Sequence, residues 1–262
     1  TSSLLLLSLV SIISTDITSI TTATKPTGIF AHAMSTASTK RGALIFLHGL
    51  GDSPAGWSSL QTSLPSLQSR LADIEYVFPA APTIPITING GMTMTGWFDV
   101  FDWPIAVGSK DDPVGLDRSV AQIEAEVAKL EGKGIPASRI VVGGFSQGAA
   151  ASLLAVYGRN TRAYAGCVCL SGWLTLPSEL KDLSATAKAT PLFWGHGQHD
   201  DKVLFPQQKF GVEKLREAGV EDVEDQSYPV GHSSHPAEVQ RLAEFVDAKL
   251  FAEQPAGVKE DL

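Results

Sequence analysis

Gly144-Phe145-Ser146-Gln147-Gly148 is the stretch that decides the fold of this 262-residue chain. An apolar run at 139–143 precedes it, and a run of small residues at 149–157 follows it. A strand, a tight turn and a helix in this order expose a serine hydroxyl at a sheet edge. The two glycines are needed because a side chain at either position would collide with a neighbouring strand or helix. We therefore predict that Ser146 is a nucleophile that attacks an acyl carbon.

The rest of the chain offers partners for this serine, although a glycine-rich turn without catalysis remains the alternative for the five residues alone. Asp200 follows the apolar segment 191–199, and His232 follows the strand-like segment 223–228. Both lie where a strand gives way to a loop, which is the edge of a parallel sheet where ligands bind. Serine, then acid, then histidine is also the chain order of α/β-hydrolase triads.

The alternation of apolar strands and amphipathic helices from Arg41 onward predicts the fold class. We expect an α/β-hydrolase fold, with a mostly parallel central sheet, helices on both faces and no large lid domain. Residues 113–130 are typical of a helix because apolar side chains recur on one face. The predicted strands are 41–48, 75–78, 139–143, 166–170, 191–194 and 223–228, and the predicted helices are 57–71 with an interruption at Pro65, 113–130, 149–157, 205–218 and 236–250.

The segment 79–112 is predicted to be a long loop that is unusually apolar. Loops of this length are usually functional. We interpret it as an acyl-binding wall beside the nucleophile, with Met92, Met94, Trp97 and Phe98 as substrate-binding residues. The alternative is a flap whose aromatic side chains pack on the core.

Composition and charge exclude some functions. The net charge of −8 and the lack of any basic run argue against nucleic acid as a partner. Cys167 and Cys169 lie two apart in a strand-like segment and are expected to be buried, unpaired thiols. His196 and His199 lie beside Asp200, but without a ligand pattern they do not predict a metal site.

Both ends of the chain are expected to lie outside a catalytic domain at 41–251, with a tail at 252–262. Residues 1–40 are interpreted as targeting-like or disordered. The apolar run 4–13 is too short for a stable transmembrane anchor. Ala31-His32-Ala33 resembles a signal-peptide cleavage site, whereas Met34 offers an alternative start. We expect a cytoplasmic location, or a secretory or organellar one if residues 1–33 are a genuine presequence.

These motifs together resemble the acyl-protein thioesterase, lysophospholipase and carboxylesterase family of small α/β-hydrolases. The resemblance implies an enzyme that cleaves esters or thioesters, needs no cofactor, and acts on substrates that include lipidated proteins and lysophospholipids, with a homodimer as one assembly. It implies Ser146 as nucleophile, Asp200 as triad acid and His232 as base, with Leu50 and Gln147 supplying the oxyanion-hole N–H groups. The matching segments are 46–52, 87–91, 97–99, 143–148, 196–203 and 231–233.

The chain departs from the family pattern at two informative positions. Asp201 stands where proline usually follows the acid, so two adjacent carboxylates compete for that role, and Asp200 is favoured because Val203 then keeps its spacing. Thr95 stands where a proline is common. Two other functions remain as alternatives: another serine hydrolase, such as a peptidase or a polyester-type esterase, and a non-catalytic binding protein.

Overall fold

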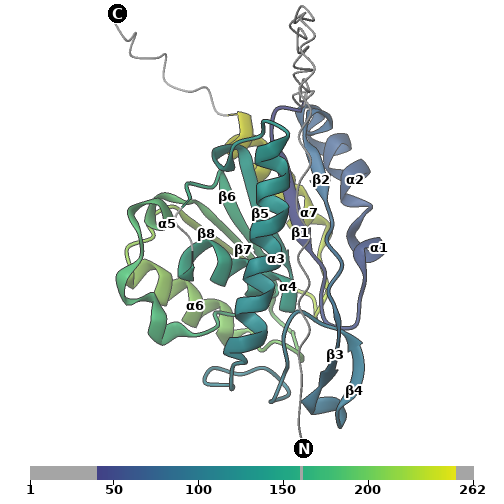
Figure 1. The fold of residues 1–262 in the computed structure, drawn as a ribbon, viewed down its shortest axis with the longest axis vertical. Helices are drawn as coiled ribbons and strands as arrows, with labels where there is room; N and C mark the ends of the chain where they lie inside the picture. The colour runs from purple at the N-terminus through teal and green to yellow at the C-terminus, as the bar shows by residue number, and fades with distance from the viewer. Residues whose placement is uncertain (1–39, 160–161, 252–262) are drawn as a thin grey trace, which may run out of the picture. The chain divides into compact units, whose positions relative to one another are not determined.

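A single parallel sheet organises the part of the chain that the computed structural model describes, residues 40–159 and 162–251. Its order is β2 (Glu75–Val77), β1 (Ala43–Leu47), β5 (Ile140–Phe145), β6 (Gly166–Leu170), β7 (Leu192–Gly197) and β8 (Val223–Tyr228) (Figure 1). Every neighbouring pair is parallel. Residues 1–39 of the predicted N-terminal segment 1–40 and the predicted tail 252–262 lie outside the described residues.

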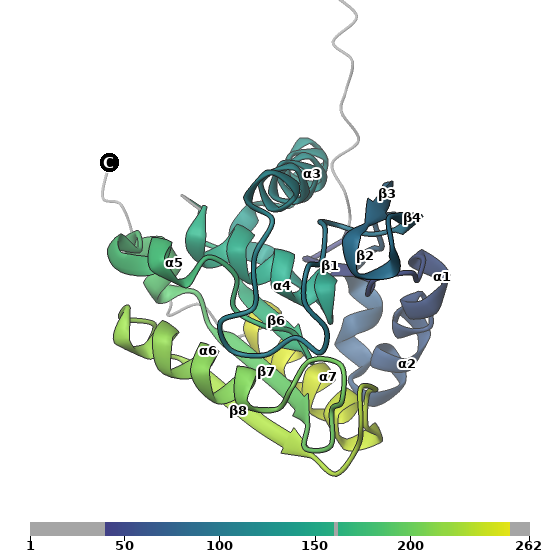
Figure 2. The same ribbon diagram turned by 90° about the horizontal axis from the view of Figure 1, so that it is seen from below.

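Helices cover both faces of this sheet. On one face lie α3 (Pro113–Gly132), α4 (Gln147–Leu153), α5 (Ala185–Ala189) and α6 (Pro206–Glu217), whereas α2 (Leu60–Leu67) and α7 (Pro236–Phe251) cover the other (Figure 2). A short α1 (Pro54–Trp57) precedes α2. The predicted α/β-hydrolase fold with a mostly parallel sheet is confirmed. Among the described helices, none combines the length and the hydropathy needed to cross a bilayer.

The central strands are apolar throughout because each of their faces is covered. Successive side chains of a strand point to opposite faces. In β1, Ala43, Ile45 and Leu47 therefore pack towards α3 and α4, whereas Leu44 and Phe46 pack towards α2 and α7. All five are at most 1% exposed. The apolar stripe predicted for 113–130 is likewise buried against the sheet.

The long connection after β2 contains structure that the sequence did not predict. Residues Thr83–Ile86 (β3) and Met92–Thr95 (β4) form an antiparallel hairpin. Its turn uses Gly90 and Gly91, which have φ of 66° and 80°, a region that glycine enters at low cost. The expected unstructured loop is thus partly a two-stranded sheet, and the segment from Gly96 to Asp112 connects it to α3.

Two helices differ from their predicted form. Of the helix expected at 57–71, only α2 is α-helical beyond Trp57, and a 3-10 helix at Ser69–Asp73 follows it, while Pro65 lies inside α2 without breaking it. Because proline has no N–H, α2 lacks the hydrogen bond that position 65 would otherwise make to the carbonyl of Gln61. The helix expected at 149–157 starts at Gln147, and its last turn, Leu154–Gly158, is a π-helix.

Candidate active site

Ser146 occupies the sharp turn between β5 and α4. Its φ of 54° and ψ of −121° lie in a region that non-glycine residues rarely adopt. At this turn β1 and α4 approach each other so closely that neither flanking glycine has room for a side chain. A Cβ on Gly144 would lie 2.6 Å from the carbonyl oxygen of Leu47, and one on Gly148 would lie 2.5 Å from the same atom. The predicted need for glycine at both positions is confirmed.

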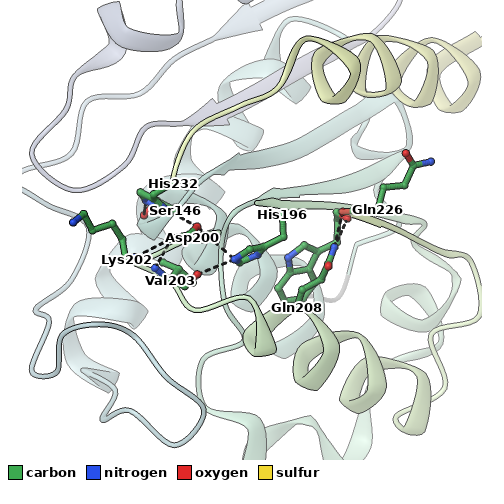
Figure 3. Close-up of polar contacts among 9 residues, drawn as sticks. Ser146, His196, Asp200, Lys202, Val203, Gln208, Gln226 and His232 are labelled. Atoms are coloured by element: carbon green, nitrogen blue, oxygen red, sulfur yellow. Dashed lines mark hydrogen bonds and ion pairs between the residues drawn. The ribbon is translucent and has the colours of Figure 1, made fainter. Parts of the chain in front are cut away.

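Three side chains from separate loops meet at the carboxyl edge of the sheet. The Nε2 atom of His232 lies 2.9 Å from the hydroxyl of Ser146. Its Nδ1 atom lies 2.7 Å from Oδ2 of Asp200 (Figure 3). Because the ionised carboxylate can only accept, Nδ1 carries the hydrogen and Nε2 faces the serine as a proton acceptor. The structure thus brings together the three residues that the sequence singled out.

The surroundings of Asp200 favour its ionised form. Burial would by itself raise the pKa of this carboxyl, but hydrogen bonding and charge from His232, with the backbone N–H groups of Lys202 and Val203, outweigh burial and lower its pKa. Both N–H groups donate to Oδ1 at 2.9 Å. The neighbouring Asp201 differs, since its side chain is 71% exposed and pairs only with Lys202 among the described residues.

The turn after β1 lies opposite the serine. His48 braces it with both ring nitrogens: Nδ1 lies 2.8 Å from the carbonyl oxygen of Gly49, and Nε2 accepts from the backbone of Ala81. Within the described part of the chain, no backbone carbonyl accepts the N–H of Leu50 or Gln147. Unpaired donors beside a nucleophile are the chemistry that an oxyanion requires.

The serine opens into a pocket of about 480 Å³, which is within the size range of ligand sites. Its uncharged polar lining comes from Ser146, Gln147, His232, Ser233 and Ser234, beside the turn at Gly49 and Leu50. The remaining walls are mostly apolar and aromatic. The lining also includes two charged side chains, Asp52 and Lys202. The apolar lining residues are Trp57, Val100, Trp103, Ile105, Phe145, Trp173 and Val203.

The four predicted substrate-binding residues do not line this pocket. Trp97 and Phe98 are 0% and 2% exposed and belong to the core under α3. The side chain of Gln147 holds this segment, because it accepts from the backbone N–H of Trp97 and donates to the carbonyl of Phe98. Met92 is 65% exposed on the hairpin. Met94 lines a neighbouring hollow of about 360 Å³ that shares Leu50 and Trp103 with the main pocket.

The pocket walls that the sequence analysis missed come from short segments next to strand ends. Trp173 follows β6, and Trp57 ends α1. Phe145 lies inside the quoted motif itself and packs 4.8 Å from the ring of His232. Position directly after a buried parallel strand is a signal that could have identified Trp173.

The remaining titratable candidates lie outside the reaction geometry. Cys167 and Cys169 are buried and unpaired, and burial raises the pKa of both thiols. His235 accepts from the backbone N–H of Ala237 at the start of α7. In residues 40–159 and 162–251, no group of three or more histidine, cysteine or acidic side chains is arranged to hold a metal ion.

The amino-acid sequence is similar to those of known proteins. Residues 30–250 match the profile of the phospholipase/carboxylesterase family. An acyl-protein thioesterase 1 of Mycosarcoma maydis is 38% identical over 223 residues, which cover 80% of this chain and 92% of that protein.

Solved structures agree with the sequence comparison. The crystal structure of SOBER1 from Arabidopsis thaliana superposes with a TM-score of 0.75 at 32% identity, covering 80% of this chain and 99% of that one. Acyl-protein thioesterase 2 of Zea mays superposes with a TM-score of 0.71, also at 32% identity, and covers 81% of this chain and 95% of that one.

Proposed function

The chain belongs to the phospholipase/carboxylesterase family of α/β-hydrolases and is a serine hydrolase of the ester and thioester type, and from this premise we propose that Ser146, His232 and Asp200 form its catalytic triad. The observation that supports the assignment is the continuous contact from serine to imidazole to carboxylate, at 2.9 Å and 2.7 Å. The three residues are 32 or more positions apart in the sequence, so the fold, not chain proximity, brings them into contact.

The acylation step follows from the proton positions. Ser146 attacks the acyl carbon while Nε2 of His232 takes the hydroxyl proton, and Asp200 stabilises the imidazolium that results. The backbone N–H groups of Leu50 and Gln147 are the donors to the oxyanion. When the tetrahedral intermediate collapses, the bond to the leaving alcohol or thiol breaks, and His232 gives its proton to that group.

Deacylation repeats the same transfers with water. His232 takes a proton from water as its oxygen attacks the acyl-enzyme, and the proton returns to Ser146 when the carboxylic acid leaves. None of these steps calls for a redox change, and His232 is the donor or the acceptor in every proton transfer.

The aromatic and aliphatic walls of the pocket favour an apolar acyl group as the part of the substrate that is bound. We place its first carbons against Trp57 and Phe145, and the end of a long chain towards Met94 and Trp103. The open mouth is compatible with a bulky leaving group, such as the cysteine of an acylated protein or a lysophospholipid headgroup. The thioesterase names of the relatives support the former.

Replacing the nucleophile tests the proposal directly. We expect Ser146→Ala to abolish hydrolysis of a p-nitrophenyl ester and labelling by a fluorophosphonate. Removing the nucleophile of a serine-hydrolase triad lowers kcat by about 10⁶-fold. Ser66→Ala, at a helix surface away from the pocket, is the matched control and should keep both. Turnover that survives in a folded Ser146→Ala protein would remove this residue from the mechanism.

A panel of substrates tests the acyl assignment separately. Oxygen esters and thioesters of increasing chain length, with peptides as the comparison, should show kcat/KM rising with chain length until the apolar walls are filled. Substituting Met94→Asp should lower kcat/KM for long chains and leave short ones unchanged. Equal loss for acetyl and palmitoyl substrates would contradict the proposed path of the chain.

A further inference from the structure

A second histidine lies behind the carboxylate of the candidate triad. His196 is the penultimate residue of β7, is 0% exposed, and reaches the Asp200 turn from inside the sheet (Figure 3). Its Nε2 atom lies 2.9 Å from the carbonyl oxygen of Val203 and 3.5 Å from Oδ2 of Asp200. The reaction described above does not use this side chain.

The partners of His196 determine its protonation. Both groups that face Nε2 are acceptors, so Nε2 carries a hydrogen. Burial lowers the pKa of His196, more than the carbonyl of Val203 and the charge of Asp200 raise it. Nδ1 has no hydrogen-bond partner among the described residues and is therefore a bare lone pair. Because the imidazole of His196 is neutral, it does not form an ion pair with Asp200 in place of His232.

The Nε2–H of His196 supplies one of the hydrogen bonds that hold the Asp200 turn. Val203 donates its N–H to Oδ1 of Asp200 and accepts at its carbonyl from His196, so Val203 links the imidazole to the carboxylate by two hydrogen bonds. Val203 is 1% exposed, and without His196 its carbonyl would lose this buried donor. The next residue, Leu204, donates to Ile105, which links the same turn to the pocket wall.

We propose that His196 is a positioning residue, whose neutral Nε2–H fixes the Asp200 turn so that Oδ2 points at His232. This inference rests on the proposed triad, because His196 acts only through Asp200. It does not line the pocket around Ser146. Its loss should therefore lower kcat and leave KM almost unchanged.

Two amide variants of similar polarity separate positioning from mere packing. Glutamine places its N–H near the position of Nε2, whereas asparagine is one carbon shorter. We expect His196→Asn to lower kcat by about 100-fold, which is the typical cost of a misplaced catalytic group. His196→Gln should recover at least about ten-fold of that loss by restoring the donor to Val203. Equal kcat in the two variants, or a loss confined to KM, overturns the proposal.

A double-mutant cycle with Asp200→Ala gives the decisive readout, measured as the rate of fluorophosphonate labelling at Ser146. A residue that acts through Asp200 has no further effect once that carboxylate is gone. We therefore expect His196→Asn to slow labelling in the native background but to leave the Asp200→Ala rate unchanged. Additive effects would mean that His196 supports the fold generally, and the proposal would fall.

The outcomes distinguish this inference from the proposed function. If Ser146→Ala remains active, the triad itself fails. If Ser146, His232 and Asp200 variants lose activity while His196→Asn keeps the native kcat, only the role of His196 fails. Urea denaturation of each variant shows whether the compared proteins are folded under the assay conditions.

Discussion

Adjacent carboxylates with different surroundings illustrate how much a single position matters. Asp200 is 5% exposed and accepts from two backbone N–H groups and from His232. Asp201 projects from the same turn into solvent, and its ion pair with Lys202 is of the exposed kind that contributes little. The backbone conformation of the turn, not the residue type, selects which of the two can orient the imidazole.

This difference predicts opposite outcomes for one substitution made at neighbouring positions. Asp200→Asn should lower kcat by about 10³- to 10⁴-fold, because an amide neither supplies the charge nor holds the imidazole in the required tautomer. Asp201→Asn should change kcat by no more than about two-fold, as is usual at exposed positions. Ester hydrolysis under saturating substrate measures both. A larger loss at Asp201 would transfer the role of acid to that residue.

The backbone of Ser146 predicts a stability difference between two inactive variants. At φ of 54°, a residue with a Cβ is strained by at least about 1 kcal/mol, whereas glycine is not. Ser146→Gly should therefore be more stable than Ser146→Ala by about 1 kcal/mol. Urea unfolding of the two proteins tests this, and equal midpoints would show that the turn is unstrained.

The contact between α4 and the end of β1 is the element-level feature that places Ser146, the proposed nucleophile. Gly148 lies against the carbonyl oxygens of Leu47 and His48, so the first turn of α4 presses on the strand that leads to the oxyanion turn. One close approach thereby positions the serine, the backbone N–H of Gln147 and the turn at Leu50 relative to one another.

Alanine at two helical glycines should therefore have opposite effects. Gly148→Ala would place a Cβ 2.5 Å from a backbone oxygen, and we expect a loss of about 3 kcal/mol or more in unfolding free energy, with activity lost as the turn shifts. Gly132→Ala, at the last residue of α3, meets nothing within 4 Å and should be neutral or stabilising by up to about 1 kcal/mol. Thermal or urea unfolding measures both, and a well-tolerated Gly148→Ala would contradict the packing argument.

For the molecule as a whole, a buried carboxyl under the sheet couples stability to pH. Glu238 in α7 is 1% exposed, packs against Gly195 of β7, and its Oε1 has no partner among the described residues. Burial raises its pKa to about 7, against a small opposing effect of the backbone N–H of His235. The folded protein therefore holds this proton more tightly than the unfolded chain does.

The consequence is a loss of stability as pH rises between about 4.5 and 7, where the unfolded chain ionises first. The shift corresponds to about 3 kcal/mol at most. Asp200 acts in the opposite sense, because its lowered pKa adds stability above its ordinary range near 3.8 and loses it under more acidic conditions. We expect Glu238→Gln to be more stable than the native protein at pH 8, and to differ little at pH 4.

Urea denaturation at both pH values tests this coupling. Glu244→Gln on the exposed side of α7 is the control, since its carboxylate pairs with Arg241 and Gln240 at the surface. Two results together would contradict the coupling: an unfolding free energy of the native protein that rises between pH 5 and 8, and no gain in stability from Glu238→Gln. They would show that the Glu238 carboxyl ionises in the folded state at little cost.

The amino-acid sequence alone determined the class of fold and singled out the three residues that we propose as the catalytic triad. Continuous apolar runs identified the central strands, because both faces of such strands are buried, and helical periodicity identified α3 and α7, because each presents one apolar face to the core. The glycines around Ser146 signalled the turn, since only glycine tolerates such close backbone approach. The hairpin at 83–95 was missed although residues 92–95 alternate apolar and polar side chains and Asn89-Gly90-Gly91 is a turn signal, because each strand has only four residues and Pro85 disfavours a strand.

Tertiary structure alone decided which apolar residues line the pocket and which carboxylate faces the imidazole. Trp97 and Phe98 are as hydrophobic as Trp57 and Phe145, yet the first pair is buried under α3 and the second lines the pocket. Hydrophobicity measures how strongly a side chain leaves water, not which neighbour it meets when it does so. That choice is made by the crossing of distant segments, which no local pattern of residues records.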